Sequence, residues 1–130
     1  MSWYLDSSAI LKIVLREKER SELLKTLTTR SISSRIARVE VKRTVSRVSP
    51  LSLVIAEEEL AKIDSIPMSF PILNIAENFS SDITLRTLDA IHVATVMSLE
   101  GSIKGLITYD KQMIANAKAL GINVIHPGMK

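Results

Sequence analysis

Four acidic residues, spread along the chain, occupy positions from which their carboxylates could meet at one point. Asp6 follows the apolar run Trp3–Leu5, and Asp110 follows a second apolar run. Glu40 and Asp89 lie in stretches with helical patterning. Clustered carboxylates repel one another unless a counter-charge is present, and Mg²⁺ and Mn²⁺ prefer oxygen ligands. The pattern predicts a divalent metal site, and beside a basic surface such a site indicates phosphodiester chemistry.

Each acid also has a purely structural interpretation. Asp6 and Asp110 could cap the helices that follow them, a common role for Asp at such positions. Ser7 or Ser8 is expected to cap the first helix instead, so a capping role for Asp6 appears redundant.

Glu40 and Asp89 could instead form ion pairs on their own helices. Glu40 lies three residues before Arg43, a spacing worth about 0.3 kcal/mol on a helix surface. Asp89 falls within the largely apolar run Leu85–Ala94, where an unpaired carboxylate is costly to bury. Either Arg86 or a metal must compensate it.

Size and charge set the class of protein. The chain has 130 residues, 46% of them hydrophobic, which fits one domain spanning residues 1–130. It has no cysteine, which excludes disulfides and thiolate sites and favours a cytoplasmic location. No apolar run reaches the roughly 20 residues that span a bilayer, and no signal peptide is expected. Residues 1–47 carry eleven Lys or Arg against five Asp or Glu, which favours a polyanionic partner.

Short β-rich runs alternate with helical stretches along the chain. The predicted strands are Trp3–Leu5, Ser31–Ser33, the edge strand Phe70–Ile75, Gly105–Tyr109 and Ile122–Ile125. The predicted helices are Ala9–Leu15, Glu17–Leu27, Arg35–Val48, Leu53–Ile63, Thr84–Leu99 and Lys111–Leu120. Such alternation predicts a parallel sheet covered on both faces, with a site beyond the carboxyl ends of its strands.

Several blocks of the sequence resemble the PIN domain family, and in particular its VapC-type toxin ribonucleases. They are Tyr4–Ala9 (YLDSSA), Glu40 in its helix, Leu85–Ala94 (LRTLDAIHVA) and Thr108–Asp110 (TYD). Together they cover nearly the whole chain in the family's order. The resemblance implies a three-layer α/β/α domain with a central parallel sheet of four to five strands.

The resemblance also implies a Mg²⁺- or Mn²⁺-dependent endoribonuclease of a type II toxin–antitoxin system. It assigns the acidic quartet to Asp6, Glu40, Asp89 and Asp110, which would serve both as metal ligands and in catalysis. Ser8 and Thr108 match polar positions that support the acids. The implied partners are RNA, a cognate antitoxin whose tail covers the acidic site, and a second copy of the chain.

The candidates for binding the RNA backbone are basic residues of the third predicted helix, together with one that precedes Asp89. Contacts to the backbone position the substrate without reading its sequence. These candidates are Arg35, Arg38, Lys42, Arg43, Arg47 and Arg86.

Three other functions are open on the sequence. A metal-free ribonuclease would need two histidines, and the chain has only His92 and His126; His92 is expected to be a packing or supporting residue. A receiver or phosphatase could use Asp6 as a phosphate acceptor. A non-catalytic RNA- or partner-binding domain could keep the fold without the chemistry.

Overall fold

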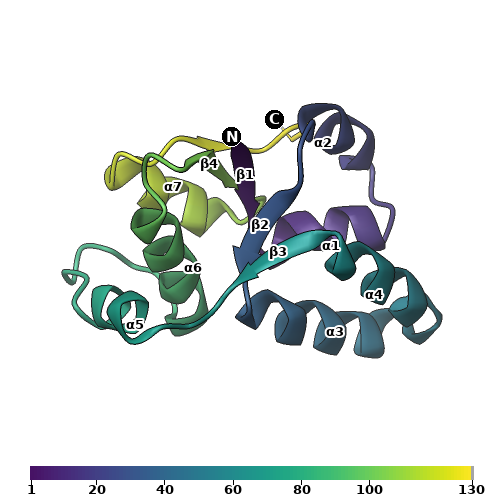
Figure 1. The fold of residues 1–130 in the computed structure, drawn as a ribbon, viewed down its shortest axis with the longest axis horizontal. Helices are drawn as coiled ribbons and strands as arrows, with labels where there is room; N and C mark the ends of the chain where they lie inside the picture. The colour runs from purple at the N-terminus through teal and green to yellow at the C-terminus, as the bar shows by residue number, and fades with distance from the viewer. Residues whose placement is uncertain (130) are drawn as a thin grey trace.

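The computed structural model describes residues 1–129. Its centre is a five-stranded, fully parallel sheet with the order β3-β2-β1-β4-β5. The strands are β1 (Ser2–Leu5), β2 (Ser31–Ser34), β3 (Ile63–Ile66), β4 (Ile103–Ile107) and β5 (Val124–Ile125). The first strand of the chain therefore lies in the middle of the sheet, between β2 and β4 (Figure 1).

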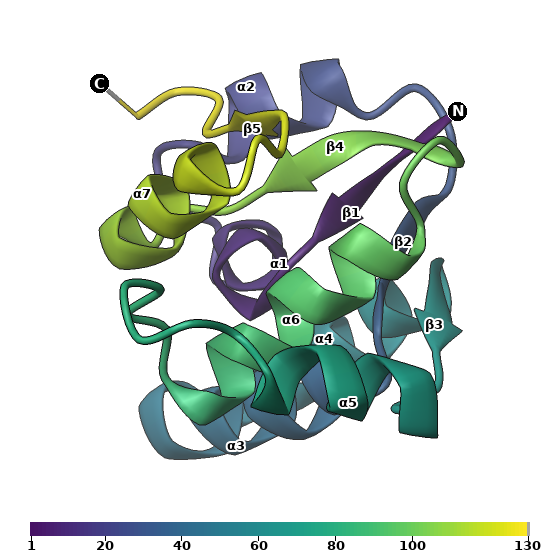
Figure 2. The same ribbon diagram turned by 90° about the vertical axis from the view of Figure 1, so that its left-hand side faces the viewer.

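Helices cover both faces of the sheet (Figures 1 and 2). On one side lie α1 (Ser7–Val14), α2 (Arg20–Thr26), α3 (Ile36–Val48) and α4 (Leu53–Ala61), with the short 3₁₀ turn Pro50–Ser52 between the last two. On the other side lie α5 (Phe70–Glu77), α6 (Thr87–Ser98) and α7 (Lys111–Ala119). The expected three-layer α/β/α architecture is confirmed.

Alternation along the central strands divides the core in two. Leu5 and Ile107 pack with α1, α3 and α4, while Tyr4 and Leu106 face α6 and α7. All four side chains are completely buried. Successive strand residues point to opposite faces of the sheet, so β1 and β4 each supply side chains to both cores. This packing holds the carboxyl ends of the two strands side by side.

The predicted edge strand Phe70–Ile75 is wrong, because this segment forms helix α5. Pro71 lies in the first turn of α5, where its missing N–H costs no hydrogen bond and its fixed φ suits a helix. A short apolar run does not by itself distinguish strand from helix.

One edge of the sheet is β3, a strand that the sequence did not predict, and the other is β5. The helix predicted over Leu53–Ile63 ends at Ala61, and Ile63 begins β3. Asp64 and Ser65 are exposed within this strand, so its sequence lacks a continuous apolar run. The other elements exist as expected, with ends displaced by up to three residues: α2 begins at Arg20, α6 at Thr87 and β4 at Ile103. No helix within residues 1–129 combines the length and apolar character that a bilayer crossing needs.

Candidate active site

The four candidate acids gather at the carboxyl edge of the sheet. Asp6 directly follows β1, and Asp110 follows β4 after two intervening residues. Strand β2 leads into α3, whose second turn carries Glu40, and Asp89 lies in the first turn of α6. Parallel strands end at one common edge, which is where open α/β sheets form their sites.

Asp6 is buried and held by three donors. Its Oδ1 accepts hydrogen bonds from the Ser8 hydroxyl (2.7 Å) and the Ala9 amide (3.0 Å), and its Oδ2 accepts from Thr108 Oγ1 (2.6 Å). Burial raises the pKa of Asp6 above its ordinary value, although His92 and the three donors oppose that rise. Ser8 and Thr108, the two polar residues expected to support the acids, both donate to this carboxylate.

Asp6 also caps helix α1 through its bond from Ala9. The expectation that a serine would cap this helix is therefore wrong. Ser8 instead donates to Asp6 and accepts from the Tyr109 amide (2.9 Å), which ties α1 to the segment after β4. The carboxylate thus combines capping with a fixed position at the sheet edge.

Glu40 is oriented by residues from two other elements. Its Oε1 accepts a hydrogen bond from Ser7 Oγ (2.5 Å) and lies 2.6 Å from Nε2 of His92. Burial raises the pKa of Glu40, but the bonds from His92 and Ser7 outweigh it and leave the pKa below its ordinary value. Among the described residues, no ion pair joins Glu40 to Arg43, so the helix-surface interpretation fails.

Asp89 is the acid without a partner. Within residues 1–129 its carboxylate makes no hydrogen bond and no ion pair, and Arg86 does not compensate it. Burial, then the charges of Asp110 and Asp6, raise the pKa of Asp89; His92 lowers it and Glu40 raises it. Asp89 thus lies within electrostatic range of the other three acids.

Asp110 caps helix α7, with Oδ1 accepting from the Met113 amide (2.8 Å). It also lines an open hollow of about 500 Å³ with five neighbours from α3 and from the start of α6. Those neighbours are Glu40, Arg86, Thr87, Leu88 and Asp89. Asp6, only 3% exposed, is not among the residues that line this hollow.

The oxygen atoms left over suit a hydrated cation. Both oxygens of Asp89, Oε2 of Glu40 and Oδ2 of Asp110 have no protein partner among the described residues. No three acidic or histidine side chains in that part of the chain are arranged to grip one ion directly, so a preformed ring of ligands is not present. Mg²⁺ usually keeps several of its waters and takes only one or two carboxylates directly, and the donor set fits it.

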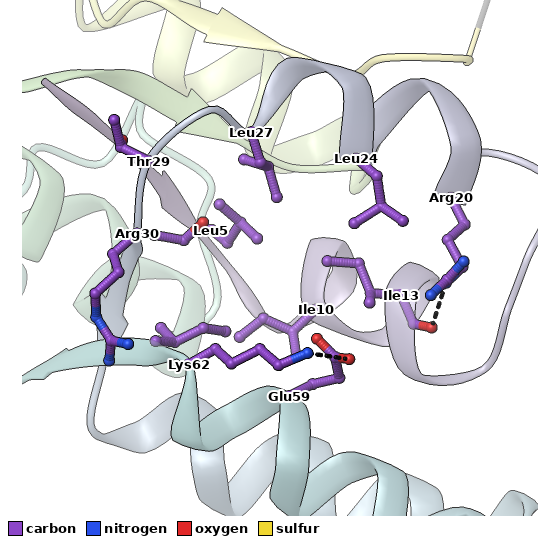
Figure 3. A pocket seen from close by; sticks show the side chains of 12 residues that line it. Leu5, Ile10, Ile13, Arg20, Leu24, Leu27, Thr29, Arg30, Glu59 and Lys62 are labelled. Carbon is purple, nitrogen blue, oxygen red and sulfur yellow. Dashed lines mark hydrogen bonds and ion pairs between the residues drawn. The ribbon is translucent and has the colours of Figure 1, made fainter.

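A second hollow, of about 480 Å³, lies between α1, α2 and β3 and contains none of the four acids. Figure 3 shows its apolar side chains converging, with basic side chains around them. Its floor includes Leu5, Ile10, Ile13, Leu24 and Leu27. The carboxylate that lines it, Glu59, is paired with Lys62, so this hollow suits a hard cation less well than the acidic hollow does.

The basic candidates on α3 divide into two groups. Arg38 and Lys42 both pair with Glu57 on α4, which neutralises part of their charge. In contrast, Arg35, Arg43 and Arg47 make no ion pair within residues 1–129. Arg43 and Arg47 line one shallow surface hollow, three and seven residues beyond Glu40 on the same helix, while Arg86 lines the acidic hollow itself.

Sequence reasoning missed two residues of this region, Ser7 and Tyr4, and gave His92 only a general role. Ser7 was considered only as a cap, Tyr4 only as part of a strand, and His92 as a packing or supporting residue. The spacing of His92, three residues after Asp89 on one helix, was the available signal. Its bond to Glu40 spans 52 residues and has no local pattern.

Sequence comparison finds clear relatives. Residues 3–119 match the model of the PIN domain. Ribonuclease VapC46 of Mycobacterium tuberculosis is 40% identical over 126 residues, which cover 95% of this chain and 96% of that protein. Ribonuclease VapC47 from the same species is 32% identical, with 96% of each chain covered.

Solved structures agree on the fold. The toxin–antitoxin complex from Klebsiella pneumoniae contains a chain that matches with a TM-score of 0.79 at 19% identity, covering 99% of this chain and 100% of that one. Mycobacterium tuberculosis VapC20, a sarcin–ricin loop cleaving toxin, matches with a TM-score of 0.75 at 14% identity, covering 97% and 100%. Because the PIN domain model matches residues 3–119 and a relative is 40% identical over 95% of the chain, the chain belongs to the PIN domain family.

Proposed function

We propose that this protein is a metal-dependent endoribonuclease and the toxin of a toxin–antitoxin pair. The observation that carries the proposal is the carboxylate of Asp89, which lines the acidic hollow with Glu40 and Asp110 and makes no hydrogen bond or ion pair within residues 1–129. The relatives named ribonucleases, at up to 40% identity over nearly the whole chain, support the same activity.

The proposed cofactor is Mg²⁺ or Mn²⁺, held by Asp89, Glu40 and Asp110, with Asp6 as a further negative charge. When bound, the ion would lower the pKa of a water molecule and neutralise charge on the scissile phosphate. Asp6 has three of its lone-pair positions occupied by donors, so its role is a fixed negative charge with one position left for a ligand. Glu40 and Asp110 each present one free oxygen and can orient water as a general base.

The proposed path for RNA runs from the acidic hollow along α3. Arg43 and Arg47 lie about 5 and 10 Å along the helix axis from Glu40, at about 1.5 Å per residue. Neither has an acidic partner among the described residues, so both are available for phosphates. Arg86 is placed to contact a phosphate at the acids themselves. Arg38 and Lys42 would contribute less, because Glu57 already compensates them.

The hydrogen bonds of Asp6 argue against a phosphate-accepting receiver. An aspartyl nucleophile needs an exposed oxygen, whereas Asp6 is 3% exposed and both of its oxygens accept bonds. The metal-free ribonuclease is disfavoured in the same way. His92 is buried and bonded to Glu40, and His126 bonds to the backbone of Met129 through Nδ1.

The partner proposals follow from the family. An antitoxin segment carrying a basic side chain could occupy the acidic hollow and replace the charge of the metal.

A second copy of the chain could cover apolar side chains left exposed on α5, where Phe70 is 83% and Leu73 is 38% exposed. Light scattering that finds only monomer at micromolar concentration would remove the dimer. A cytoplasmic location completes the proposal, since it is where such RNA and antitoxin would be met.

The test is cleavage of total RNA by the purified protein in Mg²⁺ and in EDTA, with Asp89→Asn alongside. We expect cleavage in Mg²⁺ only, and a loss of at least about 100-fold in Asp89→Asn, on the scale of one lost electrostatic group in a catalytic site. Glu77→Gln on α5 is the matched control, because that acid lies outside the quartet. Cleavage that persists in EDTA, or in Asp89→Asn at the wild-type rate, would refute the proposal and favour a different or non-catalytic site.

A further inference from the structure

A chain of buried hydrogen bonds connects strands β1 and β2 to Glu40. The Ser34 amide donates to the Tyr4 hydroxyl oxygen (3.1 Å), which lies 2.7 Å from Nδ1 of His92. Nε2 of His92 in turn lies 2.6 Å from Oε1 of Glu40. Tyr4 and His92 are 0% and 1% exposed, so water has no access to replace these bonds.

Counting donors and acceptors fixes the position of one proton in this series of hydrogen bonds. A carboxylate only accepts, so Nε2 of His92 must carry the hydrogen that points at Glu40. The Tyr4 hydroxyl already accepts from Ser34, and it has one hydrogen to give. Burial, followed by the charge of Asp6, raises the pKa of Tyr4, which keeps that hydrogen in place. The Tyr4 hydroxyl and Nδ1 of His92 lie 2.7 Å apart, so both ring nitrogens of His92 have a hydrogen-bond partner.

The same bonds decide which oxygen of Glu40 stays free. Ser7 and His92 both bind Oε1, and Oε2 has no partner among the described residues. A glutamate side chain loses up to about 1.5–2 kcal/mol of rotamer freedom when it is fixed. If that loss has already occurred on folding, it is not incurred again when a ligand binds.

We propose that His92, itself oriented by Tyr4, is a positioning residue that holds Oε1 of Glu40 and leaves Oε2 free for the divalent cation. This inference rests on the proposed function, because it takes Glu40 to be one of the ligands. The residues that hold a metal ligand in place are typically worth about 10–100-fold in metal affinity or activity. Loss of His92 should therefore appear first in metal binding.

The experiment measures Mn²⁺ binding without RNA, by the electron paramagnetic resonance signal of the free ion. His92→Leu removes the donor to Glu40, and His92→Gln retains an N–H donor at a similar reach. We expect Mn²⁺ to bind about 10–100-fold more weakly to His92→Leu, with most of the affinity restored in His92→Gln. The Mg²⁺ concentration for half-maximal RNA cleavage should rise by the same factor, with activity recovering at high Mg²⁺.

Two further variants separate positioning from simple loss of structure. Val96→Ala truncates another buried side chain of α6, one in the core on the far side from Glu40; it should lower thermal stability without changing Mn²⁺ affinity. Tyr4→Phe keeps His92 but removes the hydrogen-bond partner of its Nδ1, and we expect a several-fold loss of Mn²⁺ affinity.

A double variant gives the sharpest test, because coupled residues are non-additive. In a Glu40→Gln background, His92→Leu should weaken Mn²⁺ binding no further. Full additivity would overturn the inference, as would wild-type Mn²⁺ affinity in a folded His92→Leu protein. If His92→Leu does not fold, His92→Gln and Tyr4→Phe decide by the same measurement.

The outcome for the proposed function is read separately. Mg²⁺-dependent cleavage by the wild type, with Mn²⁺ affinity unchanged in His92→Leu, would refute the positioning role and leave the ribonuclease in place. Weaker Mn²⁺ binding in His92→Leu, with no cleavage of any RNA by the wild type, would refute the ribonuclease and leave the positioning role in place.

Discussion

Replacing Thr108 by Val tests the hydrogen bond that its hydroxyl donates to the buried carboxylate of Asp6. The two side chains have the same shape, so the substitution removes the hydroxyl with little change in packing. Thr108 is completely buried, and its Oγ1 donates to Asp6 Oδ2 at 2.6 Å while accepting from the Asp110 amide at 3.2 Å. Thr108→Val therefore removes a donor from one acid and frees the amide of another.

The expected cost follows from the charge on Asp6. A hydrogen bond to a charged group contributes about 1.5–3 kcal/mol, against about 0.5–1.5 kcal/mol for a neutral one. For a domain of this size each kcal/mol corresponds to roughly 3–5 °C in melting temperature. Thr108→Val should thus lower the melting temperature by about 5–15 °C where Asp6 is ionised.

The pH dependence has a definite sign. Because burial raises the folded-state pKa of Asp6 above its ordinary value of 3.8, protonation of Asp6 stabilises the fold, and that gain is lost as pH rises through the raised pKa. Thr108→Val removes a bond that lowers this pKa, so it raises the pKa further. Its penalty should be largest at high pH and should shrink as pH falls through the raised pKa.

The assay is thermal denaturation by circular dichroism in EDTA, from pH 5 to 9. Thr95→Val is the matched control: Thr95 is equally buried and donates to a neutral carbonyl, Ile91 O, at 2.7 Å. Its cost should stay near 0.5–1.5 kcal/mol at every pH. Equal losses in both variants, without a pH trend in Thr108→Val, would show that Asp6 does not depend on this donor.

Three further predictions concern the cation, the RNA and the fold. Mn²⁺ at about 100 times its dissociation constant should stabilise the wild type by roughly 2.7 kcal/mol and Asp89→Asn by much less; equal thermal shifts would exclude Asp89 as a ligand. Replacing Arg43 and Arg47 together by Ala should weaken RNA binding and reduce the slope of log affinity against log salt by about 1–2, whereas an unchanged slope would remove α3 from the RNA path. Gly105→Ala should prevent stable folding, because the added Cβ would lie 2.3 Å from the backbone oxygen of Asn123; a melting temperature like that of the wild type would contradict the close approach of β4 to this segment.

The sequence predicts the parts of the site that local structure places. Asp6 and Asp110 follow apolar strands, and the carboxyl ends of parallel strands share one edge. Asp89 stands out because a carboxylate in an apolar helical run needs compensation. These three positions follow from patterns within about ten residues of each acid.

The parts that escape prediction depend on tertiary contacts. Glu40 looks like a surface residue beside Arg43, yet its partners are Ser7 and His92, 33 and 52 residues away. Segment Phe70–Glu77 carries a short apolar run with a proline, a pattern that fits an edge strand or a helix start. Packing of α5 against α6 decides for the helix, and nothing local encodes it.

We propose that Asp6, Glu40, Asp89 and Asp110 together provide the negative charge that holds one divalent cation. The most direct measurement is anomalous X-ray diffraction at the manganese edge from crystals of the wild type grown with Mn²⁺. We expect a peak in the acidic hollow, with one or two of the carboxylates of Asp89, Glu40 and Asp110 as direct ligands and water between the ion and the others. A manganese peak bound elsewhere on the protein, or none in crystals of a protein that cleaves RNA, would contradict it.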